Sequence, residues 1–329
     1  MIWVKFVFSA VLIVLAANKL AEYGDVIALR TKLGGMFVGT VLLSLATSLP
    51  ELLTTVSSIE QAVPDLAVGN IFGSSMFNML MLAILDMLNR RVYILRSVAV
   101  THTLTSSLAV LLTGLAVFFL MGDFNLRIGW IGVDSLTLMG AYVFAVWIIR
   151  LNNLGGAPPP EPTEAELDEL PPLRMALIGF GLATLVLIVV TPMMVSSAVE
   201  IAAVTGLGTG FVGTTLVALV TSLPELVTTI AAGRIGAYDL AVGNLFGSNI
   251  FNIFTLGLAD IFFLDGRFLT HINPTLTMAG VMGLILTTLG MIGILAHIER
   301  RSFILQINFL LVVGYLVAVS YTHLTLPTN

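Results

Sequence analysis

The chain has 329 residues, of which 57% are hydrophobic and only 10% are charged, and its mean hydropathy is +1.04. This leaves too little polar surface for a water-soluble globule of that length, so the composition excludes a soluble protein and predicts an integral membrane protein. The absence of cysteine excludes disulfides, thiolate metal sites and a cysteine nucleophile. The net charge of −5 does not indicate a binding partner. It is a local feature, because five of the 19 acidic residues lie together between positions 161 and 169.

Ten apolar stretches are predicted to form membrane-spanning helices, in two sets of five. Each stretch supplies the roughly 20 helical residues that cross about 30 Å of hydrocarbon. A linker at 152–172, rich in proline, glycine and acidic residues, separates the first set (1–151) from the second (173–320), and we expect it to be solvated and mobile. The stretches lie near 3–20, 34–58, 66–88, 95–120, 129–150, 175–198, 208–232, 240–264, 274–297 and 303–320.

The two sets contain the same pair of motifs. TSLPE occurs at 47–51 and 221–225, and GNIFGSSMFN at 69–78 returns as GNLFGSNIFN at 243–252, always 174 positions later. From Leu33 to Asn78, 27 of 46 positions are identical to their counterparts, which establishes an internal duplication. Five spans are an odd number, so the second copy must enter the membrane in the opposite direction. The predicted fold is therefore all-α, with ten transmembrane helices as two inverted five-helix repeats, which many secondary transporters use to build a site at the midplane.

The duplication also guides the interpretation of the two ends of the chain. The first stretch looks like a signal peptide, but Met1 has its counterpart in Met175, so we expect it to be retained as a span. The last stretch turns polar at Tyr321, where its counterpart stays apolar. Residues 321–329 are therefore predicted to be a non-native or disordered tail.

Basic residues predict the orientation, because Lys and Arg favour the cytoplasmic ends of spans. With the N-terminus outside, eleven of the 14 Lys and Arg residues fall at inner ends, and only Lys5, Arg127 and Arg267 fall at outer ends. We therefore expect a multi-pass protein of the cell membrane with its N-terminus outside and its central linker in the cytoplasm.

Glu51 and Glu225 lie in the middle of equivalent spans. A charged side chain at the membrane centre costs about 2.5–3.5 kcal/mol on insertion scales, so something must offset that cost. The alternative is a protonated, hydrogen-bonded glutamate, which recurrence in both copies disfavours. Pro50 and Pro224 precede the glutamates and, lacking an N–H, free carbonyl oxygens that are tolerated at membrane depth where they line a cavity. The alternative for the prolines is a kink that serves packing.

Hydroxyl and amide groups accompany each glutamate. Thr47 and Ser48 stand one helical turn before Glu51, and Ser74 and Asn78 share one face of the next span. Their counterparts are Thr221, Ser222, Ser248 and Asn252. The alternative role of the hydroxyls is a bond back to their own helix. Glycines four apart, at 69 and 73 and at 243 and 247, are expected to pack the second span on the third and the seventh on the eighth.

Together these residues provide carboxylate, amide, hydroxyl and carbonyl oxygens without histidine or cysteine. Ligation by oxygen alone suits a hard cation: Ca²⁺ takes six to eight oxygens at about 2.3–2.6 Å, whereas transition metals favour imidazole or thiolate. Two negative charges match one Ca²⁺, or two monovalent ions or protons. If the same carboxylates bind Ca²⁺ at one time and the monovalent ions or protons at another, the two cannot be bound together. The protein would then exchange one for the other.

The doubled motif, TSLPE followed by GN-x-x-GS-x-x-x-N, resembles the alpha repeats of the calcium/cation antiporter superfamily, and most of all the prokaryotic sodium/calcium exchangers. The resemblance covers residues 1 to about 320. It implies a ten-helix transporter that expels Ca²⁺ against inward Na⁺, with the long first helix of each half sliding past a rigid core.

The resemblance also implies the ligands. Ca²⁺ would be held by Glu51 and Glu225 with the backbone oxygens of Thr47 and Thr221. Sodium sites would involve Ser48, Ser74, Ser222, Ser248, Asn78 and the backbone oxygens of Ser44 and Ala218. The family often has aspartate where this chain has Asn252, so the pocket here carries a formal charge of −2 and not −3.

The main hypothesis is a Na⁺/Ca²⁺ antiporter in the lipid bilayer, with the transported ions as its only bound ligands and no cofactor, nucleic acid or obligatory protein partner. The nearest alternative is exchange of H⁺ for Ca²⁺ or another divalent cation, because Asn252 removes a charge and two carboxylates can carry two protons. A cation channel with a carboxylate-lined pore is a more distant alternative, which the inverted repeat disfavours. An enzyme is not expected, since no nucleophile, base and orienting group occur together.

Overall fold

The protein is represented by a computed structural model that describes residues 1–30, 41, 43–88, 94–122, 124, 126–154, 170–234, 236–299 and 304–325. These residues are helical apart from short connections and one antiparallel hairpin, β1 (Arg127–Ile128) with β2 (Ile131–Gly132). Apolar segments form helices in a membrane because each backbone N–H and C=O must find its partner within the segment. The prediction of an all-α membrane fold is confirmed.

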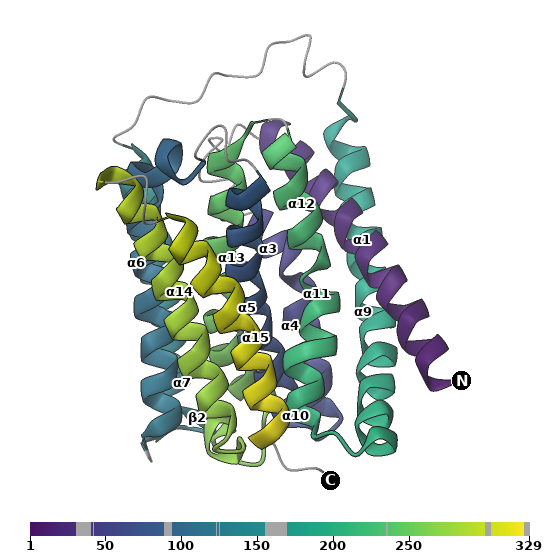
Figure 1. Ribbon diagram of the computed structural model, residues 1–329. Coiled ribbons are helices and arrows are strands. Elements are labelled where there is room, and N and C mark those ends of the chain that lie inside the picture. The colour runs from purple at the N-terminus through teal and green to yellow at the C-terminus, as the bar shows by residue number, and fades with distance from the viewer. Residues whose placement is uncertain are drawn as a thin grey trace.

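The helices follow the predicted apolar stretches in order (Figure 1). In the first half they are α1 (Ile2–Arg30), α3 (Ser44–Thr47), α4 (Leu49–Glu60), α5 (Pro64–Leu88), α6 (Ile94–Met121) and α7 (Val133–Leu154). In the second half they are α9 (Leu173–Thr205), α10 (Thr209–Val212), the π-helical turn η2 (Gly213–Val217), α11 (Ala218–Thr221), α12 (Leu223–Arg234), α13 (Tyr238–Phe262), the 3-10 turn η3 (Phe268–His271), α14 (Leu276–Glu299) and α15 (Ile304–Thr325).

Eight of the described helices are long and apolar enough to cross a membrane singly: α1, α5, α6, α7, α9, α13, α14 and α15. Residues Thr209–Thr221 and Leu223–Arg234, which are bent by 42° at a break, make a ninth candidate if the bent pair counts as one span. The predicted span at 34–58 begins outside the described residues, and its second part forms α3 and α4. The protein is therefore a multi-pass membrane protein.

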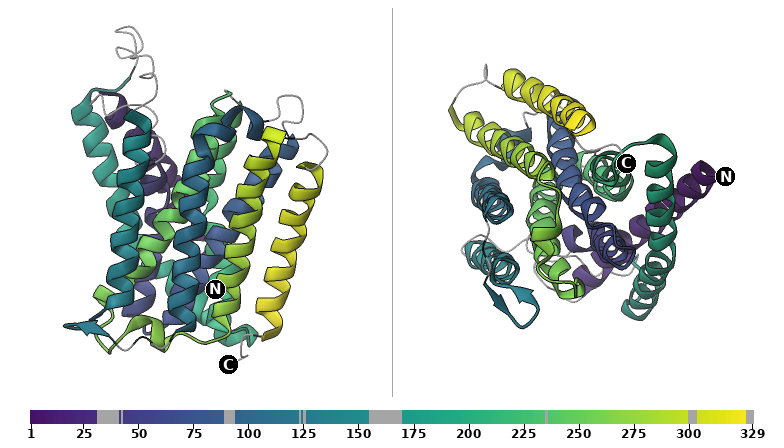
Figure 2. Two further views of the ribbon diagram at one scale, coloured as in Figure 1. Left: turned by 90° about the vertical axis from the view of Figure 1, so that its left-hand side faces the viewer. Right: turned by 90° about the horizontal axis from the view of Figure 1, so that it is seen from below.

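The helices pack around two separate hydrophobic cores. The larger core contains α5 and α13, in whose spans 89% and 78% of the residues are buried, against 44% or less in the other single spans. α6, α7, α14 and α15 surround these two central helices (Figure 2). The second core joins α1 to α9 and to the inner faces of α3, α10 and α11. The α1–α9 pair thus lies to one side of the bundle and packs on α3, α10 and α11 through this second core.

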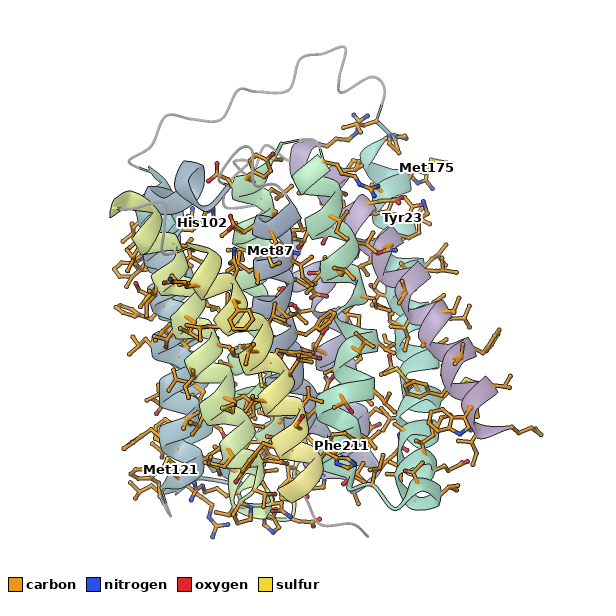
Figure 3. The ribbon with its side chains drawn as sticks, viewed as in Figure 1. Tyr23, Met87, His102, Met121, Met175 and Phe211 are labelled. Atoms are coloured by element: carbon orange, nitrogen blue, oxygen red, sulfur yellow. The ribbon has the colours of Figure 1, made fainter. Side chains whose placement is uncertain are left out.

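α1 and its counterpart α9 run in opposite directions. Tyr23, near the end of α1, and Met175, near the start of α9, lie toward the same end of the molecule (Figure 3). In the same view His102 marks that end of α6, and Met121 marks its opposite end together with Phe211 at the start of the bent span. The N-terminus lies toward the end opposite Met175, as does the C-terminal end of α15 (Figure 1).

Two of the four glycines of the repeated motif, Gly69 and Gly73, make contacts other than those predicted. A Cβ atom on Gly69 would collide with the carbonyl oxygen of Gly210, and one on Gly73 with that of Thr214. Reciprocally, a Cβ atom on Gly213 would approach the Leu66 carbonyl oxygen at 2.5 Å. α5 therefore packs backbone to backbone on α10 and η2 of the other half. The expectation that Gly69 and Gly73 serve the contact of the second span with the third is corrected: small residues are required where the two halves meet.

The C-terminal helix is longer than expected. α15 continues through Thr325, so residues 321–325 are helical and do not belong to a disordered tail. Apolar residues at the start of the helix pack in the larger core and hold it against the bundle, and a few polar residues at its end do not break it. Positions 326–329 lie outside the described residues, as does most of the linker predicted at 152–172: α7 extends into it as far as Leu154, and α9 begins directly after it at Leu173.

Candidate functional site

Both TSLPE motifs break their helices at the serine. α3 ends at Thr47 and α4 begins at Leu49, while Ser48 between them has φ −89° and ψ 8°. Ser222 has φ −89° and ψ 4° between α11 and α12. Proline two residues after the serine explains the break, because a residue without an N–H is tolerated in the first turn of a new helix and not inside a continuous one. The break places each glutamate in the first turn after an interruption of the span.

The two glutamates are buried and are held by the opposite half of the protein. Glu51 and Glu225 are each 1% exposed. Ser222 donates a hydrogen bond of 3.1 Å to Oε1 of Glu51, and Ser48 donates one of 2.8 Å to Oε1 of Glu225. Since Ser48 lies one turn before Glu51 in its own chain segment, this exchange brings the two carboxylates to the same region of the molecule.

The serines of the second motif complete the arrangement. Ser74 donates to Oε1 of Glu51 at 3.3 Å, and Ser248 donates to Oε1 of Glu225 at 3.4 Å. One oxygen of each carboxylate is therefore held by two hydroxyls, one from each half. The other oxygen, Oε2, is buried in both glutamates and has no hydrogen-bond partner among the described residues.

The two amides show the same pattern. Asn78 and Asn252 are each 1% exposed, and both use their nitrogen: Asn78 Nδ2 donates to Asn249 Oδ1 at 2.8 Å, and Asn252 Nδ2 donates to Ser75 Oγ at 3.3 Å. Their Oδ1 atoms are buried without a hydrogen-bond partner in the described part of the chain. The site thus presents four unsatisfied oxygens, two from carboxylates and two from amides.

Such a set of oxygens is suited to a cation. A buried acceptor left unsatisfied costs about 1–3 kcal/mol, and more when it is charged. Four acceptors without a donor are not satisfied by one another, whereas a hard cation accepts ligation from all of them. The fold joins each predicted glutamate to two of the predicted serines, while the two predicted amides bond to Asn249 and Ser75.

Thr47 and Thr221 occupy equivalent places beside the carboxylates. Each is the last residue before a helix break, where terminal carbonyls lack an intrahelical partner. The Thr47 hydroxyl lies 3.2 Å from Asn244 Oδ1, and the Thr221 hydroxyl lies 3.0 Å from Asn70 Oδ1. Asn70 and Asn244 were not among the predicted site residues. Their signal was available, because the same amide recurs in both copies of the GN motif.

Ser44 and Ala218 also lie at this site, but their carbonyl oxygens are already engaged. The Ser44 carbonyl accepts from the N–H of Ser48 at 2.9 Å and has the Thr47 hydroxyl at 3.3 Å. The Ala218 carbonyl accepts from the N–H of Ser222 at 3.1 Å and has the Thr221 hydroxyl at 3.3 Å. Ion ligation by these two carbonyls therefore requires the threonine hydroxyls to turn toward their other acceptors, the amides of the opposite half.

A cavity of about 270 Å³ lies next to the site, between the second half of α5 and α12. Its lining includes Leu226 and Thr229, which follow Glu225 within about one helical turn, and it extends to Arg234 at the end of α12. The Thr229 hydroxyl is buried and has no hydrogen-bond partner among the described residues. The cavity therefore approaches the carboxylate region from the end of the molecule at which α12 ends.

Comparisons with known proteins agree with this geometry. The family described as sodium/calcium exchanger protein matches residues 1–151 and 175–285. The putative antiporter CaxA of Alkalimonas amylolytica is 30% identical over 256 residues, 76% of this chain and 77% of that protein. The inner membrane protein YrbG of Escherichia coli K12 is 30% identical over 260 residues, 77% of each chain. The sodium/calcium exchanger MaX1 of Methanosarcina acetivorans is 49% identical over a shorter segment of 70 residues, 21% of this chain and 20% of that protein.

Solved structures show the same fold. The sodium-calcium exchanger NCX_Mj, from crystals soaked with Na⁺ and Sr²⁺, superimposes with a TM-score of 0.63 over 97% of this chain and 99% of that one, at 20% identity. The fold is therefore that of a membrane exchanger, and members of this family are transporters and not enzymes. With the family matched over most of its length, the chain belongs to the sodium/calcium exchanger family of cation antiporters.

Proposed function

We propose that this antiporter exchanges Na⁺ for Ca²⁺ across the cell membrane, and that Glu51 and Glu225 hold both ions in turn. The observation that carries the proposal is the set of four buried oxygens without hydrogen-bond partners, Oε2 of both glutamates and Oδ1 of Asn78 and Asn252. These four atoms are acceptors, and two of them belong to carboxylates, so a cation would stabilise them.

The charge of the site favours Ca²⁺ as one load. Two carboxylates balance one divalent cation, and Ca²⁺ accepts six to eight oxygens in flexible geometry. The four unsatisfied oxygens supply part of that shell. Hydroxyls of Ser48, Ser74, Ser222 and Ser248 contact the same carboxylates and are available as further oxygens. Mg²⁺ is a poorer match, because it requires a tight octahedron and retains its waters.

Exchange follows if one set of carboxylates serves both loads. When Ca²⁺ occupies the glutamates, Na⁺ has no compensating charge, and the reverse holds when Na⁺ is bound. The site therefore alternates between the two ions without carrying both. We further propose that Thr47 and Thr221 contribute backbone oxygens to Ca²⁺. When Na⁺ replaces Ca²⁺, we propose that the oxygens of Asn78 and of the four serines serve Na⁺, together with the backbone oxygens of Ser44 and Ala218, as the family resemblance implies.

We propose that the whole chain forms ten spans in two inverted repeats. The support is the constant offset of 174 residues, the opposite directions of α1 and α9, and the reciprocal hydrogen bonds across the site. Inverted repeats bring equivalent helix breaks face to face near the midplane, which is how secondary transporters commonly bind ions.

For the orientation, we propose that the N-terminus lies outside and the central linker in the cytoplasm, on the evidence of the eleven basic residues at one side. In this orientation Arg234, which lines the cavity beside Thr229, lies at the cytoplasmic end of α12, since α12 ends on the same side as the start of α9. We further propose that the α1–α9 pair shifts relative to the central helices when access changes sides, because its apolar contacts lie in the second core and not in the larger core around α5 and α13.

The second candidate is H⁺/Ca²⁺ exchange. It is favoured by Asn252, because an amide at that place leaves the site with two charges that two protons can neutralise. The two functions differ in the gradient that drives Ca²⁺ movement, and a single assay separates them.

The test uses purified protein in lipid vesicles loaded with Na⁺ and diluted into Na⁺-free buffer containing labelled Ca²⁺. We expect uptake that Glu51→Gln and Glu225→Gln each abolish. Glu60→Gln is the matched control, because Glu60 is an exposed glutamate on the same helix as Glu51 and should leave uptake unchanged. Uptake driven by a pH gradient without Na⁺ would instead support the second candidate, and uptake that survives both site variants would refute the proposed site.

A further inference from the structure

We propose that Ser75 and Asn249 are positioning residues that determine which end of the two site amides faces the ions. The two residues are counterparts in the repeat, 174 positions apart, and they differ between the copies, serine in one and asparagine in the other. Neither contacts a glutamate in the described structure. Each binds the amide of the opposite half, and the inference rests on the proposed ion site at those amides.

The orientation of an asparagine is a separate question from its position. Its side chain ends in an oxygen that accepts and a nitrogen that donates, and the two ends have nearly the same shape. Packing alone therefore does not choose between them, but a cation binds only the oxygen. If an amide turned over, its N–H groups would point at the cation and repel it. Neighbouring hydrogen bonds must decide the orientation.

Ser75 determines the orientation of the Asn252 amide. The Ser75 hydroxyl lies 3.0 Å from the carbonyl oxygen of Ile71, which can only accept. A hydroxyl has one proton, so once it is donated to Ile71 the Ser75 oxygen can only accept. Asn252 lies 3.3 Å from that oxygen and must present its nitrogen there. Its Oδ1 is thereby left for the site, where it is buried without a hydrogen-bond partner among the described residues.

Asn249 determines the orientation of the Asn78 amide. Asn249 Nδ2 lies 3.3 Å from the backbone carbonyl oxygen of Ser75 and 3.5 Å from the hydroxyl of Thr287. The carbonyl can only accept. The Thr287 hydroxyl donates its one proton to the Gly283 carbonyl at 2.8 Å, so toward Asn249 it can also only accept. Both neighbours therefore require the nitrogen of Asn249, and its oxygen faces Asn78. Asn78 in turn presents its nitrogen, at 2.8 Å, and leaves its Oδ1 for the site.

Both chains of hydrogen bonds end on the backbone of α5, at the carbonyl oxygens of Ile71 and Ser75. A backbone carbonyl cannot change from acceptor to donor. The direction of every hydrogen bond in the two chains, from donor to acceptor, is therefore fixed. Ser75, Asn249 and Thr287 have no exposed surface, so bulk water does not replace these bonds. The orientation of both site amides is thus determined at a distance from the ions.

The test is a pair of double-mutant cycles read by equilibrium binding of labelled Ca²⁺ to the purified full-length protein. Outer partners that orient ligands typically contribute about 10–100-fold in metal affinity. We expect Ser75→Ala and Asn249→Leu each to weaken Ca²⁺ binding by about that factor. In the Asn252→Ala background Ser75→Ala should cause no further loss, and in the Asn78→Ala background Asn249→Leu should cause none, because the amide through which each acts is absent.

The matched control is Thr113→Val, which removes another fully buried hydroxyl whose bond of 2.7 Å goes back to the Ala109 carbonyl of its own helix. It should leave Ca²⁺ affinity unchanged in every background. Losses that simply add in both cycles would show that Ser75 and Asn249 act on general packing, and would overturn the inference. If Asn249→Leu fails to fold, the cycle of Ser75 with Asn252 decides alone, since Ser→Ala removes a single atom.

Uptake by the wild-type protein in vesicles, measured alongside, separates this inference from the proposed function. Coupled losses in binding without any gradient-driven uptake would support the positioning role and overturn the exchange. Normal Na⁺-driven uptake with additive binding losses would support the exchange and overturn the positioning role. Absence of Ca²⁺ binding to the wild-type protein would overturn both.

Discussion

Ser48 donates a hydrogen bond of 2.8 Å to Glu225, a residue 177 positions further along the chain. Its counterpart Ser222 donates to Glu51 at 3.1 Å, so each half of the protein holds the carboxylate of the other. A half on its own would bury its glutamate without that donor, and an unsatisfied buried charge is strongly unfavourable. The site consequently exists only where the two halves are folded together.

The first prediction concerns these two serines. Ser48→Ala and Ser222→Ala should each raise the Ca²⁺ concentration for half-maximal uptake by about 10- to 100-fold, because a hydrogen bond to a charged group contributes about 1.5–3 kcal/mol and 1.4 kcal/mol is tenfold. The two variants should behave alike, since their roles are equivalent. Ser106→Ala is the control, because that buried hydroxyl bonds the Thr103 carbonyl of its own helix at 3.0 Å. A large effect of only one serine would contradict the reciprocal arrangement.

The second prediction concerns the charge moved in each cycle. With Asn252 in place of a third carboxylate, Glu51 and Glu225 compensate either one Ca²⁺ or two Na⁺. We therefore expect exchange of two Na⁺ for one Ca²⁺, which moves no net charge. Uptake of labelled Ca²⁺ should then be unchanged when a K⁺ gradient with valinomycin imposes a membrane potential of either sign. Uptake that follows the potential would contradict a two-charge cycle.

The third prediction tests the contact between the two halves at Gly73. A methyl group at this position would collide with the Thr214 carbonyl oxygen and lie 2.6 Å from the Cβ atom of Ala218. Gly73→Ala should therefore destabilise the protein by about 1–3 kcal/mol, the usual cost of overpacking, and lower its melting temperature in detergent. Gly140→Ala is the control, because a methyl group there meets nothing within 4 Å. Equal melting temperatures of the two variants would contradict the described packing of α5 on η2.

The fourth prediction concerns an ion pair near the hairpin of β1 and β2. Arg267 and Asp134 are 4% and 0% exposed at their side chains and are joined by a hydrogen bond of 2.7 Å. Asp134→Asn removes the carboxylate that Arg267 contacts through both Nε and Nη2, so it should destabilise the protein by about 3–5 kcal/mol.

The double variant Asp134→Leu with Arg267→Met should lose less stability than Asp134→Asn, since it buries no charge. Thermal unfolding measures the difference. Arg127→Ala, at an exposed arginine in β1, is the control for loss of a cation at this surface. If Asp134→Asn unfolds no earlier than that control, the pair is not buried as described.

The sequence alone was sufficient for the membrane class and the family motifs, and it predicted a site of oxygen ligands. Glu51 and Glu225 could be identified without coordinates because a charged residue in an apolar span is costly and recurs only where it is used. The hydroxyls and amides around them followed from helical spacing within each motif. Asn70 and Asn244 were overlooked, although their recurrence carried the same signal.

Only the tertiary structure decided which group holds which. Spacing along a helix relates residues of one segment, and it cannot show that Ser48 serves Glu225 or that Gly73 packs on Thr214. It also cannot show that Asn249 and Ser75 orient the site amides, because that depends on which neighbouring atoms are free to donate. Residue types determined what the site can bind, since oxygen chemistry is a local property. The approach of two distant segments determined how the site is assembled, because hydrogen bonds across the repeat form only when both halves are folded against each other.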